Sequence, residues 1–274
     1  MKKYFVSDLD GTLLNRYHLM DAFIIHGIKK CLKKGHGFMF ATGRHVHSRF
    51  YKDLKINKLK LPIIAMNGAL IIDENKKVLK KTFIDEDIIS DILANFKEST
   101  LRFYSEKNFF ALLDKKTYRN NCFKKRSVNF IKRIIWQRIV MKDFNYNSHS
   151  DEILSYPIYK LEYNNNDTKT YFRFKEFIKK YEDRLNIYED KHGFEIVSKK
   201  ASKAIALEYL VKYYKLNKDN IYVYGDGLND YEMINNFQHA FIPKNAHEAL
   251  KSLKVPIIKE YCHHGVIKHI LSQI

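Results

Sequence analysis

Short apolar segments that each end in a polar loop, with helical patterns between them, constrain the fold of the first eighty residues most. Tyr4–Val6, Phe38–Ala41 and Pro62–Met66 are apolar runs of strand length. Apolar residues recur at helical spacing over Met20–Lys34, and His45–Leu54 also fits a helix. Because strands that alternate with helices of about 10–15 residues form βαβ units, this pattern predicts an α/β fold with a Rossmann-like parallel sheet.

The same alternation returns near the C-terminus. Ser202 is expected to cap a helix over Lys203–Tyr214, and Ile221–Tyr224 follows as a strand. The later elements are expected as a helix from Asn229, a strand at Ala240–Ile242, a helix at Ala246–Lys251, a strand at Val255–Ile258 and a helix after Gly265. The two ends of the chain, residues 1–80 and 191–274, are therefore predicted to form one discontinuous core domain.

Residues 81–190 differ in character because aromatic residues become frequent there. The predicted strands are Leu101–Tyr104, Phe109–Leu113, Pro157–Tyr163 and Leu185–Tyr188, and the predicted helices are Asp87–Phe96, Asn129–Val140 and Lys169–Tyr181. This mixture predicts an inserted α+β domain with a sheet of its own.

Composition limits the class of protein. Apolar residues make up 45% of the 274 residues, enough for a sizeable core, and no apolar run reaches the roughly 18–20 residues of a spanning helix. The three cysteines, Cys31, Cys122 and Cys262, lie far apart and argue against a disulfide framework. We therefore expect a cytoplasmic protein without a membrane partner; the sequence does not reveal its oligomeric state.

The formal charge of +18 points to an anionic partner or to compositional bias. Residues 81–190 carry 21 basic and 17 acidic residues, so most of the excess lies in the predicted core. Within the insertion, Lys115–Lys142 has ten basic residues, no acidic residue and interleaved aromatics. This stretch fits a solvated surface, a nucleic-acid or polyanion site, or a patch that attracts phosphorylated substrates. We favour the solvated surface over nucleic-acid binding.

The loop Asp8-Leu9-Asp10-Gly11-Thr12 directly follows the first predicted strand. Ligands of open α/β sheets bind beyond the carboxyl ends of the strands, and Gly11 lets the chain curl so that both carboxylates reach one point. One carboxylate can then act as a nucleophile and the other as an acid or base, with a hard cation nearby. This pattern after an apolar triplet arises by chance in well under ~1% of such chains, so we prefer the functional interpretation over a surface turn.

Two further strand ends carry polar loops. Thr42-Gly43-Arg44 combines a hydroxyl, a glycine N–H and a helix start, which together suit a phosphate or another anion. Gly225–Asp230, with the sequence GDGLND, offers carboxylate oxygens that suit Mg²⁺. Asp230 is also favourable in the first turn of a helix for structural reasons alone.

A lysine near these carboxylates would offset the charge of a phosphoryl group. The candidates are Lys199, Lys200 and Lys203. Ser202 in the capping position directly before Lys203 favours that residue, and the other two lysines stay competitors.

In this order, DLDGT, ATGR, the later lysine and GDGLND resemble the motifs of the haloacid dehalogenase-like hydrolases. The insertion before the third motif, the sequence Met66-Asn67-Gly68-Ala69 and Gly265-Val266 before the last helix are similar to the Cof-type phosphatases of that superfamily. The resemblance covers the whole chain and implies that residues 81–190 are a cap domain. The lysine segment departs from the family pattern, and the register of its neighbours again favours Lys203.

The resemblance implies a role for each matching residue. Asp8 would attack phosphorus and form an aspartyl-phosphate, while Asp10 would protonate the leaving oxygen and later activate water. Mg²⁺ would be held by Asp8, the main-chain carbonyl of Asp10 and Asp226, with Asp230 supporting the metal or the lysine. The phosphate would be contacted by the Leu9 and Gly43 amides, Thr42, Lys203 and Asn229.

The sequence thus predicts a Mg²⁺-dependent phosphatase for small phosphorylated metabolites such as sugar phosphates. Two alternatives stay open: a phosphomutase that uses the same aspartyl-phosphate, and a nucleic-acid or polyanion-binding protein with the same fold. Other candidate ligands fit no site: Cys262, His263, His264 and His269 lack zinc spacing, and His45 and His47 fit a helix surface. No residue pattern identifies the substrate.

Overall fold

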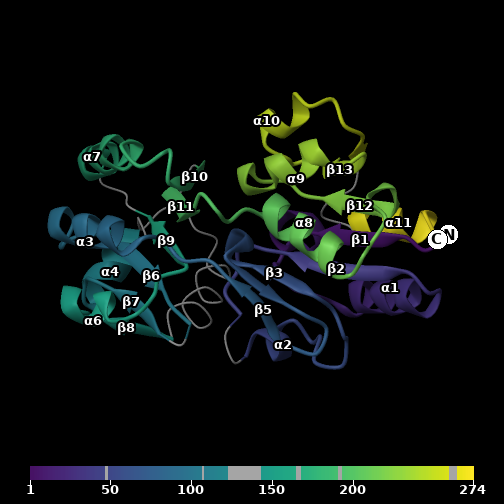
Figure 1. The fold of residues 1–274 in the computed structure, drawn as a ribbon, viewed down its shortest axis with the longest axis horizontal. Coiled ribbons are helices and arrows are strands. Elements are labelled where there is room, and N and C mark those ends of the chain that lie inside the picture. Colours follow the sequence, from purple (N-terminus) through teal and green to yellow (C-terminus); the bar gives the residue numbers. More distant parts are fainter. Residues whose placement is uncertain (47–48, 107, 123–142, 165–167, 191–192, 259–263) are drawn as a thin grey trace. The chain divides into compact units, whose positions relative to one another are not determined.

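The computed structural model describes residues 1–274 with the exception of 47–48, 107, 123–142, 165–167, 191–192 and 259–263. The chain divides into two units (Figure 1). We call Met1–Lys81 together with Ala201–Ile274 unit 1, and Thr82–Lys200 unit 2. No helix among the described residues is long and apolar enough to cross a membrane.

Unit 1 is built on an eight-stranded sheet in the order β14-β13-β12-β1-β2-β3-β4-β5. Its strands are β1 (Tyr4–Ser7), β2 (Gly37–Ala41), β3 (Ile63–Ala65), β4 (Leu70–Ile72), β5 (Val78–Lys81), β12 (Ile221–Tyr224), β13 (His239–Pro243) and β14 (Ile257–Ile258). The strands from β14 to β3 are parallel to one another, and β4 runs antiparallel to both of its neighbours, β3 and β5. The predicted α/β fold with a parallel sheet is therefore confirmed. The β4–β5 hairpin was not predicted, because the βαβ pattern looks only for strands joined by helices.

Helices cover both faces of this sheet (Figure 1). On one face, Leu207 and Leu210 of α8 (Lys203–Tyr213) share a buried cluster with Val223 of β12. On the other face, the ring of Tyr224 contacts His269 of α11 (Gly265–Ser272), which packs beside α1 (Ala22–Lys33). Successive strand side chains alternate between the faces, so strands covered on both faces are apolar throughout. The remaining helices are α2 (Phe50–Asp53), α9 (Tyr231–Asn236) and α10 (Glu248–Lys251).

The helix predicted over His45–Leu54 is shorter in the structure, where α2 covers only Phe50–Asp53. His45 and Val46 continue the loop after β2, and residues 47–48 lie outside the described part. The carbonyl oxygen of Arg44 accepts a hydrogen bond from the Met66 N–H at 3.1 Å. The start of the segment is therefore tied to the neighbouring strand end instead of to a helical turn.

Unit 2 has a six-stranded sheet in the order β10-β11-β9-β6-β7-β8. Its pairs are antiparallel except for β7 with β8. The strands are β6 (Leu101–Tyr104), β7 (Phe109–Ala111), β8 (Phe144–Tyr146), β9 (Lys160–Tyr163), β10 (Leu185–Asp190) and β11 (Gly193–Ser198), and the helices α3 (Glu86–Asn95), α4 (Lys115–Cys122), α6 (Ser150–Leu154) and α7 (Thr168–Lys179). Phe103 and Leu161 of the sheet share a buried cluster with Ile92 of α3 and Phe174 of α7. The predicted helix Asn129–Val140 lies outside the described residues.

The second boundary of the insertion falls later than the expected position between residues 190 and 191. That position separates β10 from β11, two strands that form an antiparallel pair. Strand β11 also pairs with β9, which lies well inside the insertion. The division after Lys200 keeps this three-stranded arrangement whole.

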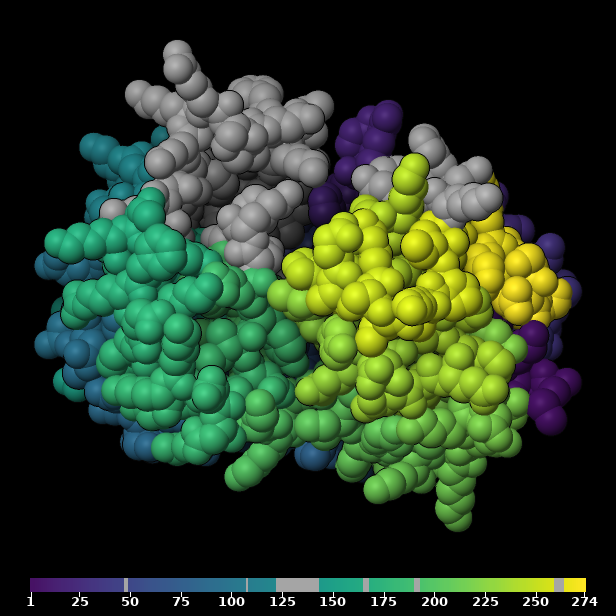
Figure 2. Space-filling model, turned by 90° about the horizontal axis from the view of Figure 1, so that it is seen from above, coloured from purple at the N-terminus to yellow at the C-terminus, as the bar shows by residue number. Residues whose placement is uncertain are grey.

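The two ends of the chain meet within unit 1. The Nζ atom of Lys3 donates a hydrogen bond to the Gln273 carbonyl oxygen at 2.6 Å. Figures 1 and 2 accordingly show the purple N-terminus beside the yellow C-terminal segment. The segments before and after the insertion therefore form one folded unit.

Candidate active site

The parallel strands of unit 1 bring the predicted site residues to one edge of the sheet. Ser7, the last residue of β1, lies level with Phe40 of β2 and with Tyr224 of β12. Asp8, Thr42 and Asp226 follow these strands, and the Asp8 N–H donates to the Tyr224 carbonyl oxygen at 2.9 Å. Three loops that are far apart in the sequence therefore end at the same place.

The turn that follows β1 depends on Gly11. This residue has a φ of +81°, and a β-carbon there would lie 2.2 Å from a carboxylate oxygen of Asp226. Only glycine fits both the conformation and the contact. The next residue, Thr12, donates its hydroxyl to Asp226 Oδ1 at 2.7 Å. The turn expected at Gly11 therefore places the loop after β1 in contact with the loop after β12.

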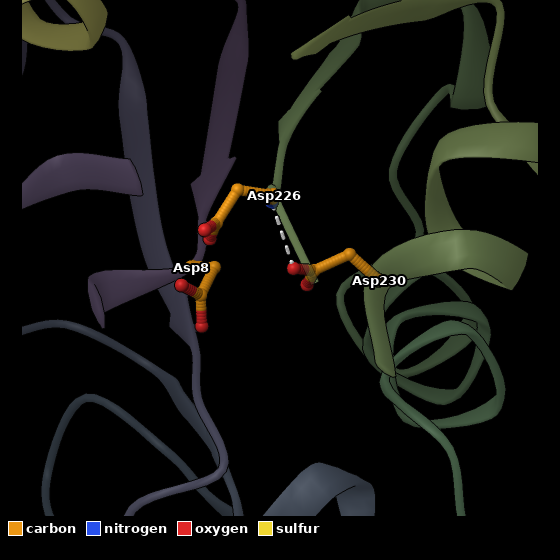
Figure 3. A group of neighbouring side chains, drawn as sticks. All are labelled: Asp8, Asp226 and Asp230. Carbon is orange, nitrogen blue, oxygen red and sulfur yellow. Dashed lines mark hydrogen bonds between the residues drawn. The ribbon is translucent and has the colours of Figure 1, made fainter. Parts of the chain in front are cut away.

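Asp8, Asp226 and Asp230 form an acidic cluster in which one oxygen of each carboxylate lies within 4.8 Å of the others (Figure 3). Asp8 and Asp230 are buried, and Asp226 is partly buried. Asp230 Oδ2 accepts from the Asp226 N–H at 3.0 Å, the dashed line in Figure 3, and also from the Gly227 N–H. Asp230, expected to support the metal or the lysine, is thus a member of the cluster and also contacts Lys203.

Lys203 lies against this cluster. Its Nζ atom is 2.7 Å from Asp8 Oδ1 and 2.7 Å from Asp230 Oδ1, and its side chain is fully buried. Lys203 begins α8, and the side chain of Ser202 caps that helix by accepting from the Ile205 N–H. Lys199 and Lys200 are exposed and belong to unit 2. Of the three candidate lysines, the structure places only Lys203 beside the carboxylates.

Burial and the neighbouring carboxylates raise the pKa values of two members of the acidic cluster, Asp8 and Asp226. Burial raises the pKa of Asp8 well above its usual value, and the nearby carboxylates add to this in spite of Lys203. Burial and the charge of Asp230 raise the pKa of Asp226 to about 7. Lys203 has a raised pKa because the attraction of Asp230 and Asp8 outweighs its burial. Ionising all three carboxylates is therefore unfavourable with Lys203 as the one buried cation that the described residues place against them, and a further cation would favour the ionised forms.

A divalent cation fits this charge and these ligands. Three carboxylates converge within one coordination sphere, and oxygen ligands are those that Mg²⁺ and Ca²⁺ prefer. Two further side chains orient Asp226: Thr12 reaches Oδ1, and Asn245 Nδ2 donates to Oδ2 at 3.1 Å and to the Gly11 carbonyl oxygen at 2.9 Å. Asn245 follows β13 and was not predicted, since its loop has neither the aspartate nor the glycine that mark the loops after β1 and β12.

The carboxylate of Asp10 has different partners. Arg44 approaches it in a bidentate manner, with Nε 2.5 Å from Oδ2 and an Nη atom 2.6 Å from Oδ1. His18 Nδ1 lies 2.8 Å from the same Oδ1. Although burial opposes it, the charge of Arg44 and these hydrogen bonds hold the pKa of Asp10 well below its usual range. The sequence predicts Arg44 only as part of an anion-binding loop, and no sequence pattern indicates His18.

His18 owes its position to a small organised loop. The side-chain oxygen of Asn15 accepts from the Tyr17 and Leu19 N–H groups, and the His18 N–H donates to the Asn15 carbonyl oxygen. His18 itself has a φ of +58°, a conformation that non-glycine residues seldom adopt. No pattern in the sequence predicts that His18 lies beside Asp10, because the folded turn brings the two residues together.

The predicted phosphate contacts lie in the loops around the cluster. Thr42 is buried, and its hydroxyl accepts from the Arg44 N–H at 3.1 Å, as expected of a tight turn after a strand. Asn229 donates from Nδ2 to Asn67 Oδ1 at 2.9 Å. Leu9 is buried in the turn after Asp8, and Gly43 follows Thr42. These residues share one edge of the sheet, and their contact with phosphate remains a prediction.

The other sequence candidates lie elsewhere or outside the described residues. His264 pairs through Nε2 with Asp21 at 2.7 Å, and Asp21 caps α1. Cys262, His263 and His47 are outside the described residues, as is most of the basic stretch Lys115–Lys142. Its first residues, Lys115–Cys122, form α4.

Comparison with known proteins gives one family. The sequence model of the haloacid dehalogenase-like hydrolases matches residues 5–270. The chain is 27% identical over 271 residues to 5-amino-6-(5-phospho-D-ribitylamino)uracil phosphatase YwtE of Bacillus subtilis, covering 94% of this chain and 93% of that protein. It is 26% identical over 286 residues to phosphatase YwpJ of the same organism, covering 98% and 100%.

The fold has close counterparts among solved structures. A haloacid dehalogenase-like hydrolase from B. subtilis superposes with a TM-score of 0.83 over 99% of both chains, at 22% identity. The structure of TM0651 from Thermotoga maritima superposes with a TM-score of 0.78 over 100% of this chain and 98% of that one, at 23% identity. At this level of identity the likeness concerns the fold.

Proposed function

Because the chain belongs to the haloacid dehalogenase-like hydrolases, we propose that it is a Mg²⁺-dependent phosphatase that hydrolyses small phosphomonoesters through an aspartyl-phosphate on Asp8. The family model and the relatives confirm two predictions, the family itself and an enzyme that is a phosphatase. The observation that carries the finer proposal is the acidic cluster of Asp8, Asp226 and Asp230, with the buried Lys203 between Asp8 and Asp230.

Asp8 is the proposed nucleophile. One of its oxygens, Oδ1, is paired with Lys203, which leaves the other carboxylate oxygen for attack on phosphorus. The P–O bond to the leaving alcohol breaks as the Asp8–phosphorus bond forms, and the alcohol oxygen takes a proton from Asp10. In the second step Asp10 accepts a proton from water, whose oxygen attacks phosphorus and releases inorganic phosphate together with a free Asp8 carboxylate.

The contacts of Asp10 bear on these two steps differently. Arg44 and His18 keep this carboxyl ionised, which is the form that accepts a proton from water in the second step. Donation in the first step requires a protonated Asp10, so Arg44 and His18 must loosen their contacts when substrate is bound.

Charge at the site suits a phosphoryl group. Mg²⁺ held by Asp8, Asp226 and the Asp10 carbonyl, with Asp230 beside them, would supply positive charge against the phosphoryl oxygens. Lys203 adds a buried ammonium group at the same place. Thr42, Asn229 and the amides of Leu9 and Gly43 would donate hydrogen bonds to the remaining oxygens. Donors fixed in advance stabilise developing charge without reorganising.

We propose that the inserted domain, unit 2, determines the substrate specificity. Unit 2 enters the chain between the segments that carry Thr42 and Lys203, and has its own sheet and core. We assign it the role of a cap, the domain that excludes water and selects the alcohol part of the substrate. Sugar phosphates and the phosphoribitylamino compound named for the B. subtilis relative are the first substrates to test.

The test is replacement of the nucleophile. Asp8→Asn should lower p-nitrophenyl phosphate hydrolysis at least about a thousandfold, and chelation of Mg²⁺ should inactivate the unaltered enzyme. Asp73→Asn is the matched control, because Asp73 is a buried aspartate of unit 1 whose hydrogen bonds serve only a turn. Full activity of Asp8→Asn would refute the mechanism, and transfer of phosphate within a sugar bisphosphate would identify a phosphomutase.

A further inference from the structure

Met66, Asn67 and Gly68 form a left-handed turn directly after β3. Their φ angles are +49°, +54° and +95°, and Met66 and Asn67 are fully buried. Asparagine tolerates this conformation, whereas a residue such as methionine seldom adopts it. Strained backbone of this kind persists only where its surroundings hold it, and it concentrates at functional sites.

The backbone of this turn contacts two loops of the candidate active site. The Asn67 N–H donates to the Thr42 carbonyl oxygen at 3.1 Å, and the Met66 N–H donates to that of Arg44. Gly68 lies against the cap of α8, since a β-carbon there would come within 2.2 Å of the Ser202 carbonyl oxygen. The turn therefore sets the spacing between the loop of Thr42 and the start of the helix that begins with Lys203.

The side chain of Asn67 reaches a third loop. Its Oδ1 atom accepts a hydrogen bond from Asn229 Nδ2 at 2.9 Å. One N–H of the Asn229 amide is used in this contact, which fixes the plane of that amide and the direction of its second N–H. The bond joins residues 67 and 229, and it holds the polar loop after β12 to the end of β3.

We propose that Asn67 is a positioning residue for phosphate binding, which orients the Asn229 amide through its side chain and the Thr42 loop through its backbone. The inference rests on the proposed function, because the phosphate contacts of Asn229 and Thr42 belong to it. Asn67 does not itself bind the phosphate in this scheme. Its contribution is to hold the side-chain amide of Asn229 in the orientation that binds phosphate.

Asn67→Gly separates the side chain from the backbone. Glycine adopts a φ of +54° without strain, so the turn and its backbone hydrogen bonds are retained while the carboxamide is lost. The dissociation constant for inorganic phosphate, measured by calorimetry in the presence of Mg²⁺, should rise about five- to tenfold. The KM for p-nitrophenyl phosphate should rise in parallel, with a smaller change in kcat.

Asn147→Gly is the matched control. Asn147 also has a left-handed φ, +61°, but it is exposed and lies in unit 2. The same substitution there should leave phosphate affinity and KM unchanged. Both glycine variants should keep the circular dichroism spectrum and melting temperature of the unaltered protein within a few degrees.

A double-mutant cycle decides whether Asn67 acts through Asn229. In an Asn229→Ala background, Asn67→Gly should cause less than a twofold further loss of phosphate affinity, because the amide that it orients is gone. Independent, multiplying losses would overturn the proposal, and so would unchanged phosphate binding in Asn67→Gly. Failure of the unaltered protein to bind phosphate or hydrolyse the ester would instead refute the proposed function.

Discussion

Two fully buried lysines, Lys203 in unit 1 and Lys160 in unit 2, each contact two carboxylates. Lys203 Nζ lies 2.7 Å from Asp8 and 2.7 Å from Asp230, and Lys160 Nζ lies 2.6 Å from Glu162 and 3.0 Å from Glu195. In both places the attraction of the carboxylates outweighs burial and raises the pKa of the lysine. The two lysines are therefore alike in their burial, in their two carboxylate partners and in the direction of their pKa shifts.

The carboxylates of the two arrangements differ. Although burial opposes it, the charges of Arg102 and Lys160 lower the pKa of Glu162 to about 2. Arg102 is a second buried cation on the same carboxylate, and the Tyr104 hydroxyl donates to it as well. In unit 1 the pKa values of Asp8 and Asp226 are raised, because burial and neighbouring carboxylates prevail over one lysine.

The ratio of cations to carboxylates therefore separates the two regions. The network of unit 2 balances its own charge, which is what a structural ion-pair network requires. In the acidic cluster of unit 1 the fully ionised carboxylates would carry an excess of negative charge over Lys203, which a divalent cation would balance. Unbalanced buried charge costs stability, and enzymes accept that cost at sites where it serves binding or chemistry.

Exchange of each lysine for methionine should have the largest effects and should affect different properties in the two units. Lys203→Met should lower kcat/KM for p-nitrophenyl phosphate by roughly a hundred- to a thousandfold, because a donor to the phosphoryl oxygens is lost. Lys160→Met should instead lower the free energy of unfolding by about 3–5 kcal/mol, since Glu162 and Glu195 lose a buried partner. Activity per folded molecule and chemical denaturation measure the two effects.

The control for Lys203 is Lys200→Met, an exposed residue that should change neither quantity. A loss of activity per folded molecule in Lys160→Met equal to that in Lys203→Met would contradict the contrast drawn between the two lysines.

Acid should weaken the network of unit 2. Because the pKa of Glu162 is lowered from its usual 4.5 to about 2, its contribution to stability is present above pH 4.5. That contribution is lost as the pH falls from about 4.5 towards 2, and it amounts to about 3 kcal/mol. Denaturant unfolding at a series of pH values measures it. Glu162→Gln should be less stable at pH 7 and should show a flatter dependence below pH 4.5; an unchanged slope would contradict the assignment to Glu162.

Mg²⁺ should stabilise the protein by binding to the acidic cluster of unit 1. At about a hundred times its dissociation constant, Mg²⁺ should raise the melting temperature by roughly 5–10 °C. Asp226→Asn should melt at or above the temperature of the metal-free unaltered protein, because an ionised Asp226 is unfavourable where its pKa is raised to about 7. The same variant should lose the response to Mg²⁺. Asp73→Asn should keep that response, and a full response in Asp226→Asn would exclude Asp226 as a ligand.

Local sequence patterns determined much of this molecule. Runs such as Tyr4–Val6 and Ile221–Tyr224, each followed by a loop with aspartate and glycine, predicted strands whose ends meet at one edge. That inference needs only strand periodicity and the geometry of parallel sheets. It placed Asp8 and Asp226 side by side although more than two hundred residues separate them.

Tertiary structure alone decided which side chains face each other. Arg44 and His18 on Asp10, Asn245 on Asp226, and Asn67 on Asn229 are contacts between loops whose sequences carry no signal for their partners. Lys203 was favoured among three lysines by its helix cap, and only packing placed it in the acidic cluster. Periodicity and turn residues report on a few neighbours along the chain, whereas charge balance at a buried site depends on every group that the fold brings within a few ångströms.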